Sequence, residues 1–157
     1  MSYLENHKFR PAEDYVNLNP RSIIKADDCI IQAIMYSRNM KSSLDWVDIY
    51  KEMAWIGLNN FIASNHPVAC FKYLSRHGYE VHNIGKENKI PTATFLDDHT
   101  EGNYVVMVNR HAFAYIDGKI YDKFNYIQNP DLDLDELTRQ YVEEKYPYVI
   151  HYAKLPE

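Results

Sequence analysis

The hydrophobic pattern divides the chain into a polar start and a patterned remainder. Residues 1–27 show no sustained period and contain Pro11, Pro20 and several Asn and Asp residues, so they are predicted to form an extended arm lying over a folded domain. After Asp27 and Asp28 the pattern changes to the apolar run CIIQAIMYS. Acidic residues before such a run can cap a helix and favour the positive end of its dipole. A buried helix is therefore predicted, with Cys29 in its first turn.

Two more helices are predicted in the first half. One runs from Ser42 or Ser43 to about Gly57, where apolar residues recur mostly at helical spacing. The next begins near Asn65-His66-Pro67, with Asn65 as the cap and the proline in the first turn, and it ends before Gly78.

The second half changes to a strand-like pattern. Residues 79–84 and 103–109 are β-branched and aromatic runs bounded by polar residues. HAFAYI and KIYDKF flank Asp117-Gly118, which favours a type I′ hairpin turn. A helix from about Asp133 to Lys145 and a final strand YVIHYAKL complete the prediction. The expected fold is α+β, with N-terminal helices, one of them central and bearing the cysteine, packed on a C-terminal antiparallel sheet.

Composition narrows the class of protein. The length of 157 residues fits one domain spanning 1–157. A net charge of −5 opposes attraction to a phosphate backbone, so no nucleic-acid partner is expected. No signal-peptide pattern or long apolar run occurs, and the two cysteines lack CxxC spacing. These features predict a cytoplasmic protein with free thiols that does not bind membranes.

One cysteine has a setting that suits nucleophilic chemistry. A helix N-terminus and a neighbouring imidazolium both favour the thiolate, which is the reactive form of the side chain. Cys29 meets the first condition, and His111, which begins the strand leading into the Asp-Gly turn, is the candidate for the second. Cys70 lies inside a predicted helix beside apolar residues and is expected to be a buried structural thiol.

The hairpin register selects the group that orients His111. If Asp117 and Gly118 form a two-residue loop, paired residue numbers sum to 235, and Asp122 lies on the same face as His111 as a diagonal neighbour. Asn125 would then point through the sheet to the other side, because side chains alternate along a strand. A three-residue loop would reverse this preference. We therefore predict Asp122, with Asn125 as the alternative.

Two segments together resemble the papain-like cysteine peptidases, and more closely their compact peptidase-C39-like and phage-encoded members. DDCIIQAI is similar to the nucleophile helix, and YVVMVNRHAFAYIDGKIYDKFN to the strand-His-strand-Asp module, in the same chain order; together they cover about a fifth of the chain. The resemblance implies a catalytic triad of Cys29, His111 and Asp122, with thiolate attack on the carbonyl of a protein or peptide substrate and an acyl-enzyme intermediate.

The chain departs from that pattern near the oxyanion hole and the cleft. No Gln precedes Cys29, and Asn17 and Asn19 are the nearest amides that could donate to an oxyanion. Arg110 stands directly before His111, where it would charge the substrate cleft and suit a negatively charged substrate terminus. The absent Gln motivates an alternative: a catalytically silent papain-like module that binds a host or partner protein through its tyrosine-rich surface.

No cofactor or metal is expected. The sequence has no Gly-rich nucleotide motif and no HExxH or GxSxG pattern. His66, Cys70 and His77 share helical spacing, but no convincing fourth ligand completes a zinc site. The same triad serves hydrolases, deamidases and acyltransferases. The three residues therefore do not decide whether water or an amine accepts the acyl group.

Overall fold

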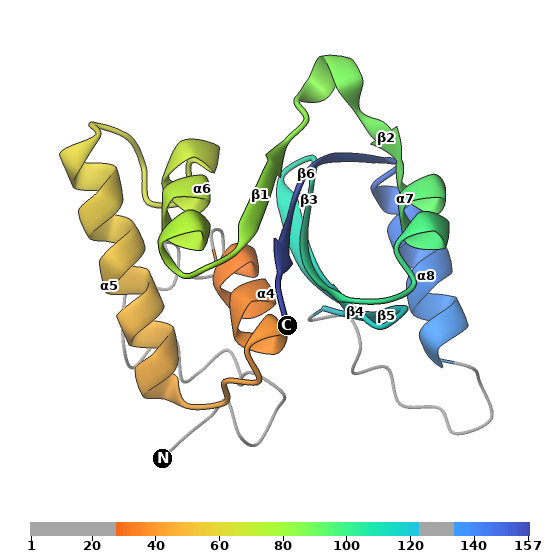
Figure 1. Ribbon diagram of the computed structural model, residues 1–157, viewed down its shortest axis with the longest axis horizontal. Coiled ribbons are helices and arrows are strands. Elements are labelled where there is room, and N and C mark those ends of the chain that lie inside the picture. The colour runs from red at the N-terminus through yellow and green to blue at the C-terminus, as the bar shows by residue number, and fades with distance from the viewer. Residues whose placement is uncertain (1–27, 123–133) are drawn as a thin grey trace.

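The computed structural model describes residues 28–122 and 134–157 and has the α+β class predicted from the sequence (Figure 1). The expected arm at residues 1–27 lies outside the described residues. The described part holds five α-helices, one 3₁₀ helix and six strands: α4 (Cys29–Ser37), α5 (Ser43–Asn59), α6 (Pro67–Arg76), β1 (Glu80–Asn83), η1 (Lys86–Asn88), β2 (Ile90–Pro91), α7 (Thr92–Asp98), β3 (Asn103–Val108), β4 (His111–Ile116), β5 (Lys119–Tyr121), α8 (Leu134–Lys145) and β6 (Tyr148–Leu155).

The six strands form one antiparallel sheet. Its order is β1-β6-β3-β4-β5, and β2 also pairs with β6. The last strand of the chain is therefore inserted between β1 and β3, which ties the C-terminal segment to the middle of the domain. Strands β3 and β4 are buried along nearly their whole length, as expected for strands covered on both faces.

The hairpin that follows β4 has the predicted register. Ile116 pairs with Lys119, Tyr115 with Ile120 and Ala114 with Tyr121. Asp117 and Gly118 form the two-residue turn with φ angles of 48° and 83°, as a type I′ turn requires. The two-residue loop, and with it the sum of 235, is confirmed.

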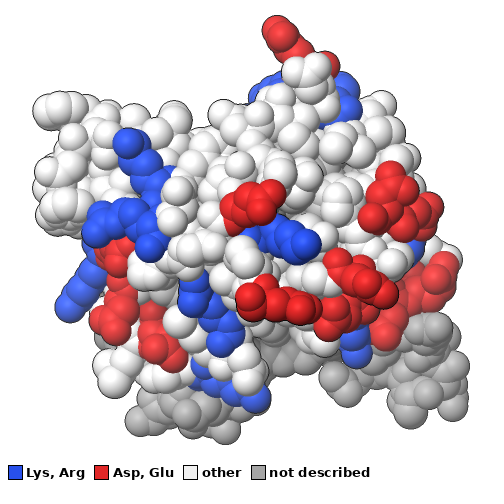
Figure 2. All heavy atoms as spheres, in the orientation of Figure 1, with Lys and Arg blue, Asp and Glu red and all other residues white. Residues whose placement is uncertain are grey.

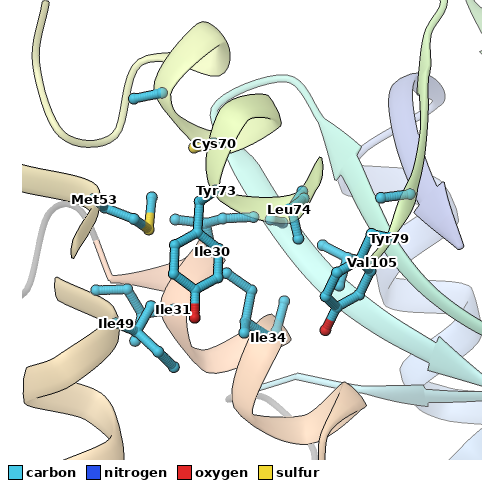
Figure 3. Close-up of a cluster of buried hydrophobic side chains, with 14 of the residues drawn as sticks. Ile30, Ile31, Ile34, Ile49, Met53, Cys70, Tyr73, Leu74, Tyr79 and Val105 are labelled. Atoms are coloured by element: carbon cyan, nitrogen blue, oxygen red, sulfur yellow. The ribbon is translucent and has the colours of Figure 1, made fainter. Parts of the chain in front are cut away.

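Helices cover the sheet on both faces and bury two hydrophobic clusters. On one face, the buried side of α4 lies between helices α5 and α6 and the strands, and Figure 3 shows Ile30, Ile34, Leu74 and Val105 converging there. On the other face, α7 and α8 pack on the sheet around Phe95. Strand β3 serves both clusters because its side chains alternate between the two faces.

Capping residues in the sequence account for where some helices begin, but the sequence pattern did not predict every element. Helix α5 begins where predicted, and Ser42 caps it by accepting a hydrogen bond from the Leu44 N–H at 3.1 Å. Asn65 was expected to cap α6, but the cap is His66, whose Nδ1 accepts from the Val68 N–H at 3.1 Å. The sequence pattern did not predict η1, β2 or α7. None of the helices within 28–122 and 134–157 is both long and apolar enough to cross a bilayer.

Candidate functional site

Three segments bring the predicted site residues together. Cys29 is the first residue of α4, His111 is the first residue of β4, and Asp122 directly follows β5. The cysteine-bearing helix packs closely on β4. The confirmed register of the β4–β5 hairpin puts the Asp122 side chain on the face of the sheet that carries His111.

The closest contact in the site joins His111 to Asp122. Nε2 of the imidazole lies 2.5 Å from Oδ2 of the carboxylate, and both side chains are buried, with 5% and 4% exposed. The Tyr146 ring stacks on the imidazole at a centroid distance of 4.7 Å and an angle of 14°. Stacking on one face and a charge-assisted hydrogen bond at one edge hold the ring in a single orientation.

The thiol of Cys29 lines the same cleft as the imidazole of His111. Its interaction with the imidazole is one of the causes that raise the pKa of His111. Burial acts to lower the pKa of His111, but the hydrogen bonds and negative charges of Asp122 and Cys29 outweigh it and raise the pKa to about 9. The raised pKa favours the imidazolium form of His111 at neutral pH.

The start of α4 differs from the prediction in one respect. Asp28 occupies the N-cap position, but its side chain makes no capping hydrogen bond. Its buried carboxylate instead accepts a hydrogen bond from Gln32 Nε2 at 2.8 Å, one turn along the helix. Helix geometry leaves the first N–H groups of α4 without intrahelical partners, and the N–H of Cys29 is among them.

Cys29 opens into a cleft of about 530 Å³. Its walls come from the start of α4, the start of α6, the connection after β1, the β3–β4 turn and β6. Cys29 is partly exposed there, whereas Cys70, which also belongs to the lining, is 3% exposed. The lining residues are Cys29, Ile30, Asn65, Pro67, Cys70, Lys86, Met107, Val108, Asn109, Arg110, His111, Ala112, Ile150 and His151.

Arg110 lies in this cleft lining, as predicted. Asn109 and Arg110 form the two-residue turn between Val108 and His111, which are paired in the sheet. Arg110 adopts a positive φ of 59°, the conformation that such a tight turn needs at its second position. The turn thus fixes Arg110 beside the imidazole-bearing strand.

The second cysteine and the helical histidines have other contacts. Burial is the main cause that raises the pKa of Cys70 to about 12, and the nearby Cys29 adds to it. A raised pKa fits the expected structural thiol. The His66 side chain caps α6, and His77 Nε2 lies 2.7 Å from Glu52 Oε2. Among the described residues, no three or more His, Cys, Asp or Glu side chains are grouped so that they could hold a metal ion.

Three of the predicted residues lie outside the described part of the chain, namely Asn17 and Asn19, the candidate oxyanion donors, and Asn125, the alternative to Asp122. The sequence reasoning missed four residues at the site: Tyr146, which stacks on His111, and the lining residues Asn65, Lys86 and His151. They come from α8, α6, η1 and β6 or the residues beside them, so only the tertiary fold brings them to the cysteine. No sequence pattern around these four residues links them to Cys29.

Comparison with known proteins gives no relative for this chain: no family model, no curated protein and no solved structure matches it.

Proposed function

We propose that this protein is a papain-like cysteine-dependent hydrolase that cleaves a peptide or related amide bond through an acyl-enzyme. The proposal gives Cys29 the role of nucleophile, His111 that of general acid and base, and Asp122 that of orienting group. One observation carries it: a buried imidazole lies 2.5 Å from a buried carboxylate and lines the same cleft as the partly exposed thiol of Cys29, with which it interacts. A structural histidine needs only one such partner.

The reaction can be written on these groups. The Cys29 sulfur, as thiolate, attacks the substrate carbonyl, and the C–S bond forms as the carbonyl becomes an oxyanion. When the oxyanion collapses, the C–N bond breaks and the His111 imidazolium gives its proton to the leaving amine. Water then attacks the thioester carbonyl while His111 takes a proton from it, the C–S bond breaks, and the carboxylic acid product leaves with the thiolate–imidazolium pair restored.

The position of Cys29 also supplies part of the oxyanion stabilisation. Its own N–H lies at the N-terminus of α4, where the helix dipole favours negative charge. The Asp28 carboxylate next to it is engaged with Gln32 along the helix. Asn65 and Asn109 also line the cleft, and each carries a side-chain amide that can donate a hydrogen bond.

The arrangement of elements supports the papain-like interpretation. A cysteine-bearing helix packed on an antiparallel sheet, with the histidine at a strand start and the acid on the next strand, is what the resemblance of DDCIIQAI and the hairpin module implies. The same triad serves deamidases and acyltransferases, so the proposal concerns the acyl-enzyme step first.

The acyl-enzyme can be tested before any natural substrate is known. We would incubate the protein with p-nitrophenyl acetate, follow p-nitrophenolate release, and map acetylation by mass spectrometry. The proposal predicts an acetyl thioester on Cys29 that hydroxylamine removes, with turnover beyond one equivalent. Cys29→Ala and His111→Ala are expected to abolish that turnover, while Cys70→Ala retains it. Acetylation confined to lysines, or equal turnover in Cys29→Ala, would refute the proposal and favour a binding module.

A further inference from the structure

The cleft beside Cys29 differs in charge from the rest of the protein. The chain has 22 Asp and Glu residues against 17 Lys and Arg, and Figure 2 shows acidic side chains gathered on the α7–α8 side of the molecule. The described lining of the cleft contains two basic residues, Lys86 and Arg110, and no Asp or Glu. The described walls of this cavity thus carry no acidic side chain, although the protein as a whole is acidic.

Neither cation is neutralised within the described part of the chain. Lys86 and Arg110 are both exposed, and the ion pairs among residues 28–122 and 134–157 involve other basic residues, such as Lys119 and Arg139. A cleft lined by one sign of charge concentrates counter-ions and orients them. The positive potential is therefore available to a ligand.

The backbone positions that carry both cations are fixed by local structure. Arg110 occupies the positive-φ position of the tight β3–β4 turn, directly before His111. Lys86 begins η1, and the preceding residue, Gly85, donates its N–H to the Ile150 carbonyl at 2.9 Å, which anchors this connection to β6. Two connections far apart in sequence thus each present one cation to the same cleft.

We propose that the cleft selects a substrate bearing a carboxylate near the scissile carbonyl, with Lys86 and Arg110 as its counter-charges. This specificity rests on the proposed hydrolase function. The carboxylate can belong to an acidic side chain or to the C-terminus of the substrate, since both present the same planar anion to Lys and Arg.

The test compares two alkylating reagents that differ in charge. Iodoacetate and iodoacetamide are nearly equal in size, so the ratio of their rates at Cys29 reports the local potential, free of enzymatic turnover. We expect Lys86→Gln/Arg110→Gln to lower the iodoacetate-to-iodoacetamide ratio about three- to tenfold at low salt, and added NaCl to lower the wild-type ratio. Lys89→Gln removes one positive charge from the connection that carries Lys86 but outside the cleft lining, and it is expected to leave the ratio unchanged.

Short peptides then distinguish the two sources of carboxylate. Acetyl-Ala-Glu-amide is compared with acetyl-Ala-Gln-amide, and acetyl-Ala-Ala with a free carboxylate is compared with its amide, as protectants of Cys29 against iodoacetamide. Stronger protection by one acidic peptide, lost in the double variant, supports the proposal and identifies the source. An unchanged reagent ratio, or equal protection by acidic and neutral peptides, overturns it.

Failure of the hydrolase proposal would look different. In that case the iodoacetamide rate at Cys29 would not depend on His111, whatever the effect of the two cations on the reagent ratio.

Discussion

Replacing Asp122 by Asn removes the charge that faces His111 and keeps the shape of the side chain. Both partners are almost fully buried, and the hydrogen bond between them is 2.5 Å long. An amide oxygen can still accept from the imidazole, but it cannot offset the cost of a buried positive charge. The substitution therefore tests whether the carboxylate is what keeps the imidazole protonated.

The expected size follows from the pKa of His111. A rise from 6.5 to about 9 corresponds to about 3 kcal/mol of preferential stabilisation of the imidazolium in the folded protein. Because the folded-state pKa lies above the unfolded value, this stability is fully present below about pH 6.5 and is lost as pH rises through about 9. Without the Asp122 charge, burial lowers the pKa, and we expect a fall of at least about one to two pKa units.

Two measurements check this prediction. Urea unfolding at pH 6 and pH 9 is expected to show a difference in the free energy of unfolding of about 2–3 kcal/mol for the wild type and less than about 1 kcal/mol for Asp122→Asn. A histidine NMR titration, with His111→Ala for assignment, reads the pKa directly. Asp135→Asn, which removes a 61%-exposed carboxylate 3.6 Å from Lys119, is the matched control and should behave as wild type.

If Asp122→Asn keeps the wild-type pH dependence of stability and the wild-type titration of His111, the Asp122 carboxylate is not what keeps the imidazole protonated. In that case another group holds the imidazolium, and Asp122 is a bystander.

Three further predictions concern the fold and the pH profile. Gly57→Ala places a Cβ 2.7 Å from the Ile62 carbonyl oxygen, so we expect a loss of about 1–3 kcal/mol in urea unfolding, although alanine stabilises an ordinary helix site. Ile34→Ala, at a fully buried position, is expected to cost about 2–5 kcal/mol, whereas Leu44→Ala, at a 72%-exposed position, changes stability by less than about 0.5 kcal/mol. Turnover of an amide substrate should fall as pH rises through about 9, where His111 loses the proton it gives to the leaving amine; an unchanged rate above that pH would contradict the assigned role.

The sequence predicted the His111–Asp122 contact because its determinants are local. Asp117 and Gly118 adopt the positive φ angles of a type I′ turn, the turn fixes the register, and side-chain alternation then decides which acid lies on the face of His111. The first turn of α4 was also readable from the boundary between acidic and apolar residues. The direction of the Asp28 side chain was not, because it depends on a competing hydrogen bond to Gln32.

The rest of the site could not be predicted because tertiary packing creates it. Helix α7 has seven residues, too few for a clear helical period, and it is stabilised by packing Phe95 and Leu96 against the sheet. Lys86 and His151 reach the cleft from η1 and β6, and nothing in their sequence neighbourhood points to Cys29.

The most direct test is the rate of Cys29 alkylation by iodoacetamide as a function of pH, measured by intact mass with peptide mapping in the wild type and in His111→Ala. Buried Cys70, whose pKa is raised to about 12, serves as the internal control. The account predicts that Cys29 reacts readily below pH 7, that Cys70 does not, and that Cys29 loses this advantage without His111. Equal rates for Cys29 in the two proteins, or a Cys29 as unreactive as Cys70, would contradict the existence of an activated thiolate–imidazolium pair.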